Sequence, residues 1–160
     1  MEANAILSKL EKAAPGKVLE SGRFGRSDLL SVWIESTAVH AFAKAVSEEP
    51  TLKLQWLENL SVAEVGDSLV VSWFLRSRET QAQLVMRSSV IITSEKEAVE
   101  LASVCDVWPM AAPLENEAAQ LFGIRFKNAS GETIETCRTL LADDSEFPMR
   151  KSYSVGASAK

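Results

Sequence analysis

Residues 69–76 alternate between apolar and mixed side chains, and this alternation constrains the fold more than any other stretch of the chain. Leu69, Val71, Trp73 and Leu75 share one face of an extended segment. The intervening residues are Val70, Ser72, Phe74 and Arg76. Because successive side chains of a strand point to opposite faces, one face of this strand is apolar and the other is mixed. The pattern is typical of a sheet that helices cover on one side.

The other patterns of the first two thirds of the chain predict helices and strands around this strand. Apolar spacing predicts a helix over residues 3–14 that ends at Pro15-Gly16, and a second helix that Thr37 caps and residues 48–50 close. The predicted strands cover residues 17–20, 29–34, 52–60, 69–76 and 82–92, and a hairpin turn covers 22–25. This order predicts a single two-layer α+β domain with a mixed sheet of four to five strands, helices on one side and an extended C-terminal segment.

The character of the chain changes after Ser94. We expect a turn or two of helix within residues 95–105 and a linker bracketed by Pro109 and Pro113. A short helix then covers residues 114–122 and ends at Gly123, a natural residue for a left-handed cap, and residues 127–132 form a loop. We therefore divide the chain into an α+β domain (1–105), a helix-turn and tail of the same domain (106–153) and a frayed tail (154–160).

Length, composition and charge favour a soluble protein. A chain of 160 residues suits one domain and holds a core without disulfides or a structural metal. Its 46% hydrophobic and 24% charged residues are ordinary for a globular protein. The net charge of −5 repels phosphate backbones, so nucleic acid is not an expected partner. We find neither a signal peptide nor a membrane span, and we expect a cytoplasmic protein that meets a membrane only through partners.

The residues that carry chemistry do not form a recognisable catalytic or metal-binding pattern. Cys105 and Cys137 lack metal-ligand spacing and are expected to be free thiols in a reducing compartment. His40 is the lone histidine, and we expect it to be a surface or half-buried helix residue. No GxSxG, phosphate-binding loop or metal-ligand cluster is present, so the sequence predicts no catalytic residues, no cofactor and no metal site.

Two groups of acidic residues allow alternative interpretations. Asp143 and Asp144, near Glu146, are a candidate site for a hard cation such as magnesium, although a solvated acidic turn or a set of interface acceptors is the favoured interpretation. Glu115 and Glu117 are separated by about 200° around a helix, so they point to nearly opposite faces and do not form an acid–base pair. In the first turn of the helix, the negative charges of both glutamates interact favourably with the helix dipole.

Three motifs in the C-terminal third resemble one family. Residues 115–126 read Glu-Asn-Glu-Ala-Ala-Gln-Leu-Phe-Gly-Ile-Arg-Phe and follow Asp-Val-Trp-Pro at 106–109. They resemble the signature of the thirty-kilodalton subunit of proton-pumping NADH–quinone oxidoreductase, complex I, which runs Glu-Arg-Glu through an acidic residue to Gly-Ile-x-Phe. Residues 140–144 resemble its Leu-Leu-Pro-Asp/Glu-Asp turn, and residues 148–153 resemble its His-Pro-Leu-Arg-Lys-Asp-Tyr close. The sequence departs from the family pattern at Asn116, Gln120, Ala142, Phe147, Ser152 and Ser154.

The resemblance implies a non-catalytic accessory subunit of the peripheral arm. In that family the subunit binds no cofactor, packs against the large subunit that helps form the quinone site, and supports assembly. The docking residues implied here lie in 114–126 and 138–153, and they are Glu115, Glu117, Leu121, Phe122, Phe126, Asp143, Asp144, Arg150, Lys151 and Tyr153. Arg150 and Lys151 are expected to pair with partner carboxylates, and Phe122, Phe126 and Tyr153 to act as apolar anchors. The alternative for Phe122 and Phe126 is that they fill this domain's own core.

Two other assignments stay open at this point. In the first, the chain is the equivalent subunit of a related membrane-bound hydrogenase-type complex. In the second, it is a stand-alone protein-binding domain derived from the family. An independent enzyme is a distant third. For the accessory subunit, the expected location is the cytoplasmic face of the membrane, as part of the complex.

Overall fold

The computed structural model describes residues 3–134, 140–141 and 146–154. The elements in chain order are α1 (Ala3–Ala13), β1 (Val18–Arg23), β2 (Leu30–Ile34), the 3₁₀-helix η1 (Ser36–Ala38), α2 (Val39–Glu48), β3 (Trp56–Val65), β4 (Ser68–Arg76), β5 (Gln83–Ile91), β6 (Val99–Ala102), α3 (Ala111–Phe122) and β7 (Ile124–Lys127). Apart from Ser154, the predicted frayed tail lies outside the described residues.

Five strands form one mixed sheet in the order β1-β2-β5-β4-β3. The neighbours are antiparallel except for β2 and β5, which run parallel. A second, two-stranded parallel sheet pairs β6 with β7. The fold is therefore the predicted α+β domain with a mixed sheet.

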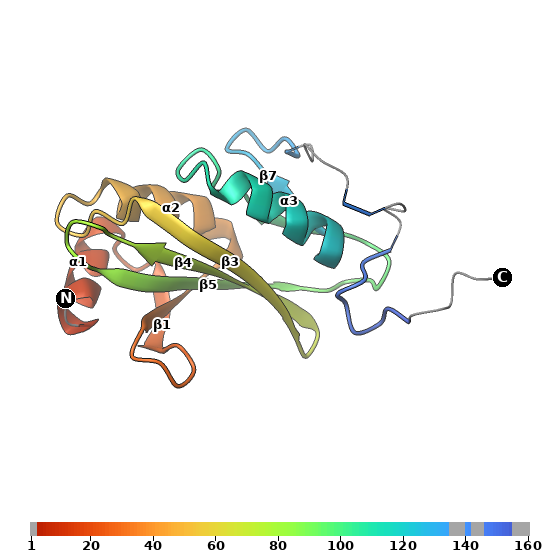
Figure 1. Ribbon diagram of the computed structural model, residues 1–160, viewed down its shortest axis with the longest axis horizontal. Coiled ribbons are helices and arrows are strands. Elements are labelled where there is room, and N and C mark those ends of the chain that lie inside the picture. Colours follow the sequence, from red (N-terminus) through yellow and green to blue (C-terminus); the bar gives the residue numbers. More distant parts are fainter. Residues whose placement is uncertain (1–2, 135–139, 142–145, 155–160) are drawn as a thin grey trace.

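The hydrophobic core lies on one face of the five-stranded sheet. The four apolar positions of β4 named above are buried in one core cluster, together with Ile6 and Leu10 of α1, Phe42 of α2 and Phe122 of α3. Figure 1 shows α2 and α3 on the same side of the sheet. The prediction that helices cover one side is confirmed. We call the opposite side, to which the core cluster does not extend, the open face. It carries Trp33, Phe74, Arg87 and Ser89, which are half-buried or exposed, and Ser31, Val70, Ser72 and Val85, which are buried.

Three local predictions were wrong, each for a physical reason. Residues 99–102 form strand β6 rather than a helical turn, because Val99 and Leu101 are buried and the strand pairs with β7. The second helix starts through η1, and Thr37 does not cap it, since the N-cap of α2 is Ala38 without a side-chain bond. The linker before α3 is shorter than expected, because Pro113 lies in the first helical turn, where the missing N–H costs little.

The third strand also starts later than predicted. It begins at Trp56 rather than residue 52, because the chain turns at residues 50–52 and Lys53 has a φ of 51°. The first strand continues through Gly22 to Arg23, so the hairpin turn lies further along, around Gly25.

Gly123 ends α3 as predicted, and two independent constraints select glycine there. Its φ is 68°, and its N–H donates to the carbonyl of Ala119 at 2.9 Å. A Cβ at this position would lie 2.5 Å from the ring of Phe147. The turn between α3 and β7 therefore accepts the Phe147 ring against bare backbone.

Gly123→Ala is expected to lower the free energy of unfolding by about 2 kcal/mol, because it adds overlap with Phe147 to left-handed backbone strain. Gly16→Ala is the matched control, since Gly16 also follows a helix with a φ of 65° but has no atom within 4 Å of its Cβ position. We expect about 1 kcal/mol for the control. Urea unfolding of both variants measures the difference, and equal losses would show that the Phe147 contact contributes nothing.

Candidate docking site at the C-terminal strap

Arg150 fastens the C-terminal segment to the rest of the domain. Its side chain is buried, with 4% of the residue exposed. The guanidinium donates to five backbone carbonyls at 2.8–3.3 Å, those of Ser94, Glu95, Glu97, Phe122 and Gly123. Burial lowers the pKa of Arg150, and Glu64 partly offsets this effect. The arginine therefore joins the loop after β5 to the turn that follows α3.

Further contacts hold the residues on either side of Arg150. The N–H of Met149 donates to the carbonyl of Leu121 at 3.0 Å, and the N–H of Lys151 donates to Glu64 Oε2 at 2.8 Å. The guanidinium carbon of Arg150 lies 4.4 Å from the centre of the Phe147 ring. We call residues 146–153 the strap, because these bonds tie the segment to α3 and β3.

The residues predicted for docking divide into a buried and a surface group. Glu115, Phe122, Phe126 and Arg150 are buried, and both phenylalanines belong to the core. Glu117 and Lys151 are exposed, while Leu121 and Tyr153 are half-buried. Asp143 and Asp144 lie outside the described residues. Sequence reasoning missed that Arg150 binds carbonyls of its own chain, because its acceptors lie far from it in the sequence.

Glu115 is a buried carboxylate that organises the segment before α3. Its Oε2 accepts a hydrogen bond from Ser103 Oγ at 2.5 Å, and its Oε1 accepts one from the N–H of Val104 at 2.9 Å. Burial raises the pKa of Glu115 to about 7, against the effect of these two bonds, and Asp106 raises it further. Glu117 is exposed on the other side of the helix, so the predicted opposite directions of the two glutamates are confirmed.

His40 joins α2 to the same segment. Its Nε2 lies 2.8 Å from Asp106 Oδ2, and the imidazole is half-buried, as predicted for this histidine. Burial raises the pKa of Asp106, but the hydrogen bond and charge of His40, with backbone amide bonds, leave it below its ordinary value. The Ser103 hydroxyl bonds to Glu115 rather than to His40, so these groups do not form a nucleophile–histidine pair.

The described residues contain no group of three or more histidine, cysteine or acidic residues placed to hold a metal ion. Cys105 is a half-buried free thiol. Cys137 and the predicted acidic pair at 143–144 lie outside the described residues. Among the helices in the described part of the chain, none is both long and apolar enough to cross a bilayer.

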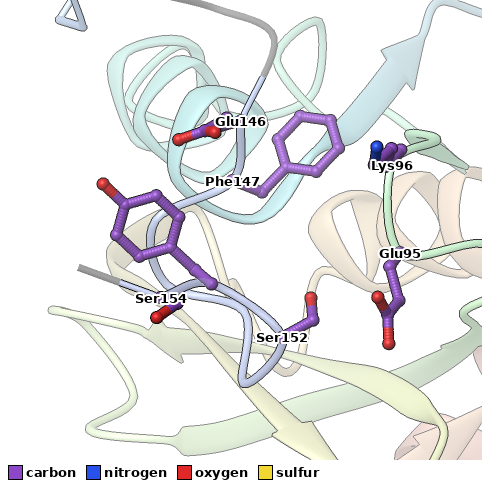
Figure 2. A pocket seen from close by; sticks show the side chains of 7 residues that line it. Glu95, Lys96, Glu146, Phe147, Ser152 and Ser154 are labelled. Atoms are coloured by element: carbon purple, nitrogen blue, oxygen red, sulfur yellow. The ribbon is translucent and has the colours of Figure 1, made fainter. Parts of the chain in front are cut away.

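An open hollow of about 380 Å³ runs beside the strap. Figure 2 shows Glu95 and Lys96 on one side and Glu146, Phe147, Ser152 and Ser154 of the C-terminal segment on the other. A second hollow of about 420 Å³ lies between the strap and the β3–β4 turn. The side chains that line the first hollow are exposed or half-buried. Two open hollows beside a segment that is held in place form an uneven surface that another protein can contact.

The fold and this site define a class: a two-layer α+β domain whose mixed sheet is covered by helices on one side and whose C-terminal strap is fastened by a buried arginine. The chain belongs to the family described as respiratory-chain NADH dehydrogenase, 30 Kd subunit, whose model matches residues 32–159. The resemblance noted in the C-terminal motifs is thereby confirmed.

Two relatives and one solved structure agree with this placement. Both relatives are the NADH-quinone oxidoreductase subunit that is designated by the letter C. The chain is 30% identical to that of Roseiflexus castenholzii (strain DSM 13941 / HLO8) and 29% identical to that of Roseiflexus sp. (strain RS-1); each alignment covers 95% of this chain and 84% of the relative. A chain from the membrane-bound sulfane sulfur reductase, an archaeal respiratory membrane complex, superposes with a TM-score of 0.76 at 17% identity. That likeness covers 98% of this chain and 88% of the other, and it shows a shared fold.

Proposed function

We propose that this chain is a non-catalytic accessory subunit of the peripheral arm of a respiratory NADH–quinone oxidoreductase. In this role it docks onto the large subunit that helps form the quinone site, and it supports assembly and electron transfer to quinone at the cytoplasmic face of the membrane. The observation that carries the proposal is the family match over residues 32–159, which spans strands β3 to β7, α2, α3 and the strap. Its partners are then other subunits of the complex.

The exposed side of the strap and α3 is the surface we assign to docking. It presents Met149, which is 56% exposed, with Glu117, Leu121, Lys151 and Tyr153. Apolar side chains within a charged surround are the composition of a protein interface with a polar rim. The bonds of Arg150 hold the strap in one position before binding, and this reduces the entropy lost on association.

The proposal is tested by purifying the tagged full-length chain from native membranes in mild detergent. We expect the large quinone-site subunit to co-purify. Met149→Asp is expected to reduce its recovery about tenfold, because a carboxylate at the interface must be desolvated. Leu19→Asp is the matched control, since Leu19 is 61% exposed on β1, at the other edge of the sheet from β3. Recovery of the chain without any oxidoreductase subunit would refute the proposal.

A further inference from the structure

We infer that the open face of the sheet is a second docking surface, on which Arg87 binds a carboxylate carried by a protein partner. The inference deepens the proposed function and rests on it for one point, that the partner is another subunit of the same complex. It concerns the side of the sheet that faces away from α2 and α3. It is therefore distinct from the docking surface assigned to the strap.

Arg87 lies against two aromatic rings on the open face. It lies on β5 opposite Trp33 of β2. Its guanidinium carbon is 4.1 Å from the centre of the Trp33 ring and 5.4 Å from that of Phe24. Phe24 comes from the β1–β2 connection and packs edge-to-face on Phe74 of β4, with ring centres 5.2 Å apart. A guanidinium stacked in this way is pre-positioned, so less entropy is lost when it binds an anion.

This guanidinium has no anion among the described residues. The ion pairs of the described chain use Arg23, His40, Lys53, Arg76 and Lys127, and none of them includes Arg87. The Nε of Arg87 is buried without a hydrogen-bond acceptor in the described part of the chain. Ser31, which is only 3% exposed and lies on the same face, also has an Oγ without a partner there. Arg87 as a whole is half-buried, and its terminal nitrogens are not among the buried atoms, so a partner carboxylate binds the guanidinium through these nitrogens in a charge-assisted pair.

A second arginine on this face is stacked on an aromatic ring in the same way. Arg78 stacks on Trp56, with its guanidinium carbon 4.1 Å from the ring centre, and it makes no ion pair among the described residues. Trp56 is 41% exposed and pairs with Arg76 in register, which places it on the open face. The chain carries a net charge of −5, yet this face presents two stacked arginines that no carboxylate of the described residues pairs with. Charge complementarity therefore points to an acidic partner.

The composition of the open face indicates that its partner is a protein segment rather than a polyanion. Val65 and Ile91, at its far end, are 59% and 68% exposed. Exposed tryptophan and arginine are typical of the residues that dominate protein interfaces. Nucleic-acid binding instead requires several phosphate contacts from clustered basic residues. The fitting occupant is an extended or helical segment that combines apolar side chains with an aspartate or glutamate.

A photo-crosslinking amino acid at position 89 tests the surface in the native assembly. Ser89 is exposed on the open face, two residues from Arg87 on the same strand. The tagged full-length chain is irradiated in cells and then purified. We expect an adduct with another subunit of the complex, attached at a segment that contains an aspartate or glutamate. The same amino acid at Glu11, an exposed residue of α1, serves as the position control and should not give this adduct.

Charge variants show whether Arg87 carries the contact. Arg87→Glu is expected to lower the adduct yield about tenfold, and Arg87→Lys is expected to lower it less. Changing the mapped partner acid to lysine should restore the yield with Arg87→Glu. Thermal unfolding of each purified variant checks the fold. If Arg87→Glu does not fold, the adduct yield of Arg87→Met is compared with that of the parent protein instead.

The outcomes separate this inference from the proposed function. Recovery of the complex without a protein adduct at position 89 would overturn the inference and leave the proposed function standing. The inference is equally overturned by adducts only to nucleic acid or lipid, or by a yield that Arg87→Glu and Arg87→Met leave unchanged. A different outcome is an Arg87-dependent adduct with an acidic protein segment while no oxidoreductase subunit co-purifies. This outcome would support the docking surface and refute the proposed function.

Discussion

Arg150→Ala is expected to lower the free energy of unfolding by about 3 to 5 kcal/mol. The reason is that the buried guanidinium donates to five carbonyls from two separate segments, and alanine removes this donor; of the five, the Gly123 carbonyl keeps the N–H of Val99 as a donor. Urea unfolding followed by circular dichroism measures the loss. The size of the effect follows from charge-assisted bonds, of which those to the carbonyls of Phe122 and Gly123 are fully buried.

Two further variants separate the arginine's geometry from its charge. Arg150→Lys keeps the charge but not the planar fork, so we expect it to recover only a small part of the loss. Lys151→Ala removes an exposed charge from the neighbouring residue, and we expect a change within about 0.5 kcal/mol. A stability of Arg150→Ala within about 1 kcal/mol of the parent protein would contradict the role given to the strap.

Glu115→Gln is expected to change how stability depends on pH. Burial raises the pKa of Glu115 in the folded chain to about 7 from an ordinary value of 4.5. The protonated carboxyl is therefore favoured by folding. Its contribution to stability is fully present below pH 4.5 and is lost as the pH rises through about 7. Glutamine stays neutral, donates to Ser103 Oγ and accepts from Val104 N–H, so it keeps both contacts without this loss.

The measurement is the free energy of unfolding of both proteins at about pH 5 and about pH 8. We expect Glu115→Gln to gain stability relative to the parent protein between these pH values, by at most about 3 kcal/mol. Glu117→Gln, on the exposed side of α3, should show no such gain. Parallel pH profiles for Glu115→Gln and the parent protein would contradict the buried, proton-linked state of Glu115.

Local patterns in the sequence predicted the parts of the fold that depend on neighbouring residues. The alternation at Leu69–Leu75 identified the core face of β4, and Gly123 marked the end of α3. Helical geometry separated Glu115 from Glu117. Periodicity did not reveal β6, because four residues are too few to show a period and the partner strand lies beyond α3. A strand defined by a distant partner carries little local signal.

The sequence predicted which residues belong to the site, but not whether their side chains face a partner or the protein's own core. The motifs picked out Arg150 and Phe122, yet whether such residues face a partner or their own core depends on contacts across the chain. Arg150 bonds to carbonyls 53 to 56 residues earlier, and no spacing rule connects these positions. Arg87 had no signal, because its importance arises from Trp33 and Phe24, which only the folded sheet brings to it.

The parallel pairing of β2 with β5 has a consequence for the folding kinetics. The strands β3, β4 and β5 are joined by short turns and pair in sequence, so they form a local unit. The β1–β2 hairpin is a second local unit, and it joins the first through the connection of residues 35–55, which contains η1 and α2. Loop closure of this length costs entropy before any contact repays it, and it slows folding. We expect the two units to meet late, so that Arg87 makes its contacts with Trp33 and Phe24 in the same step that completes the sheet.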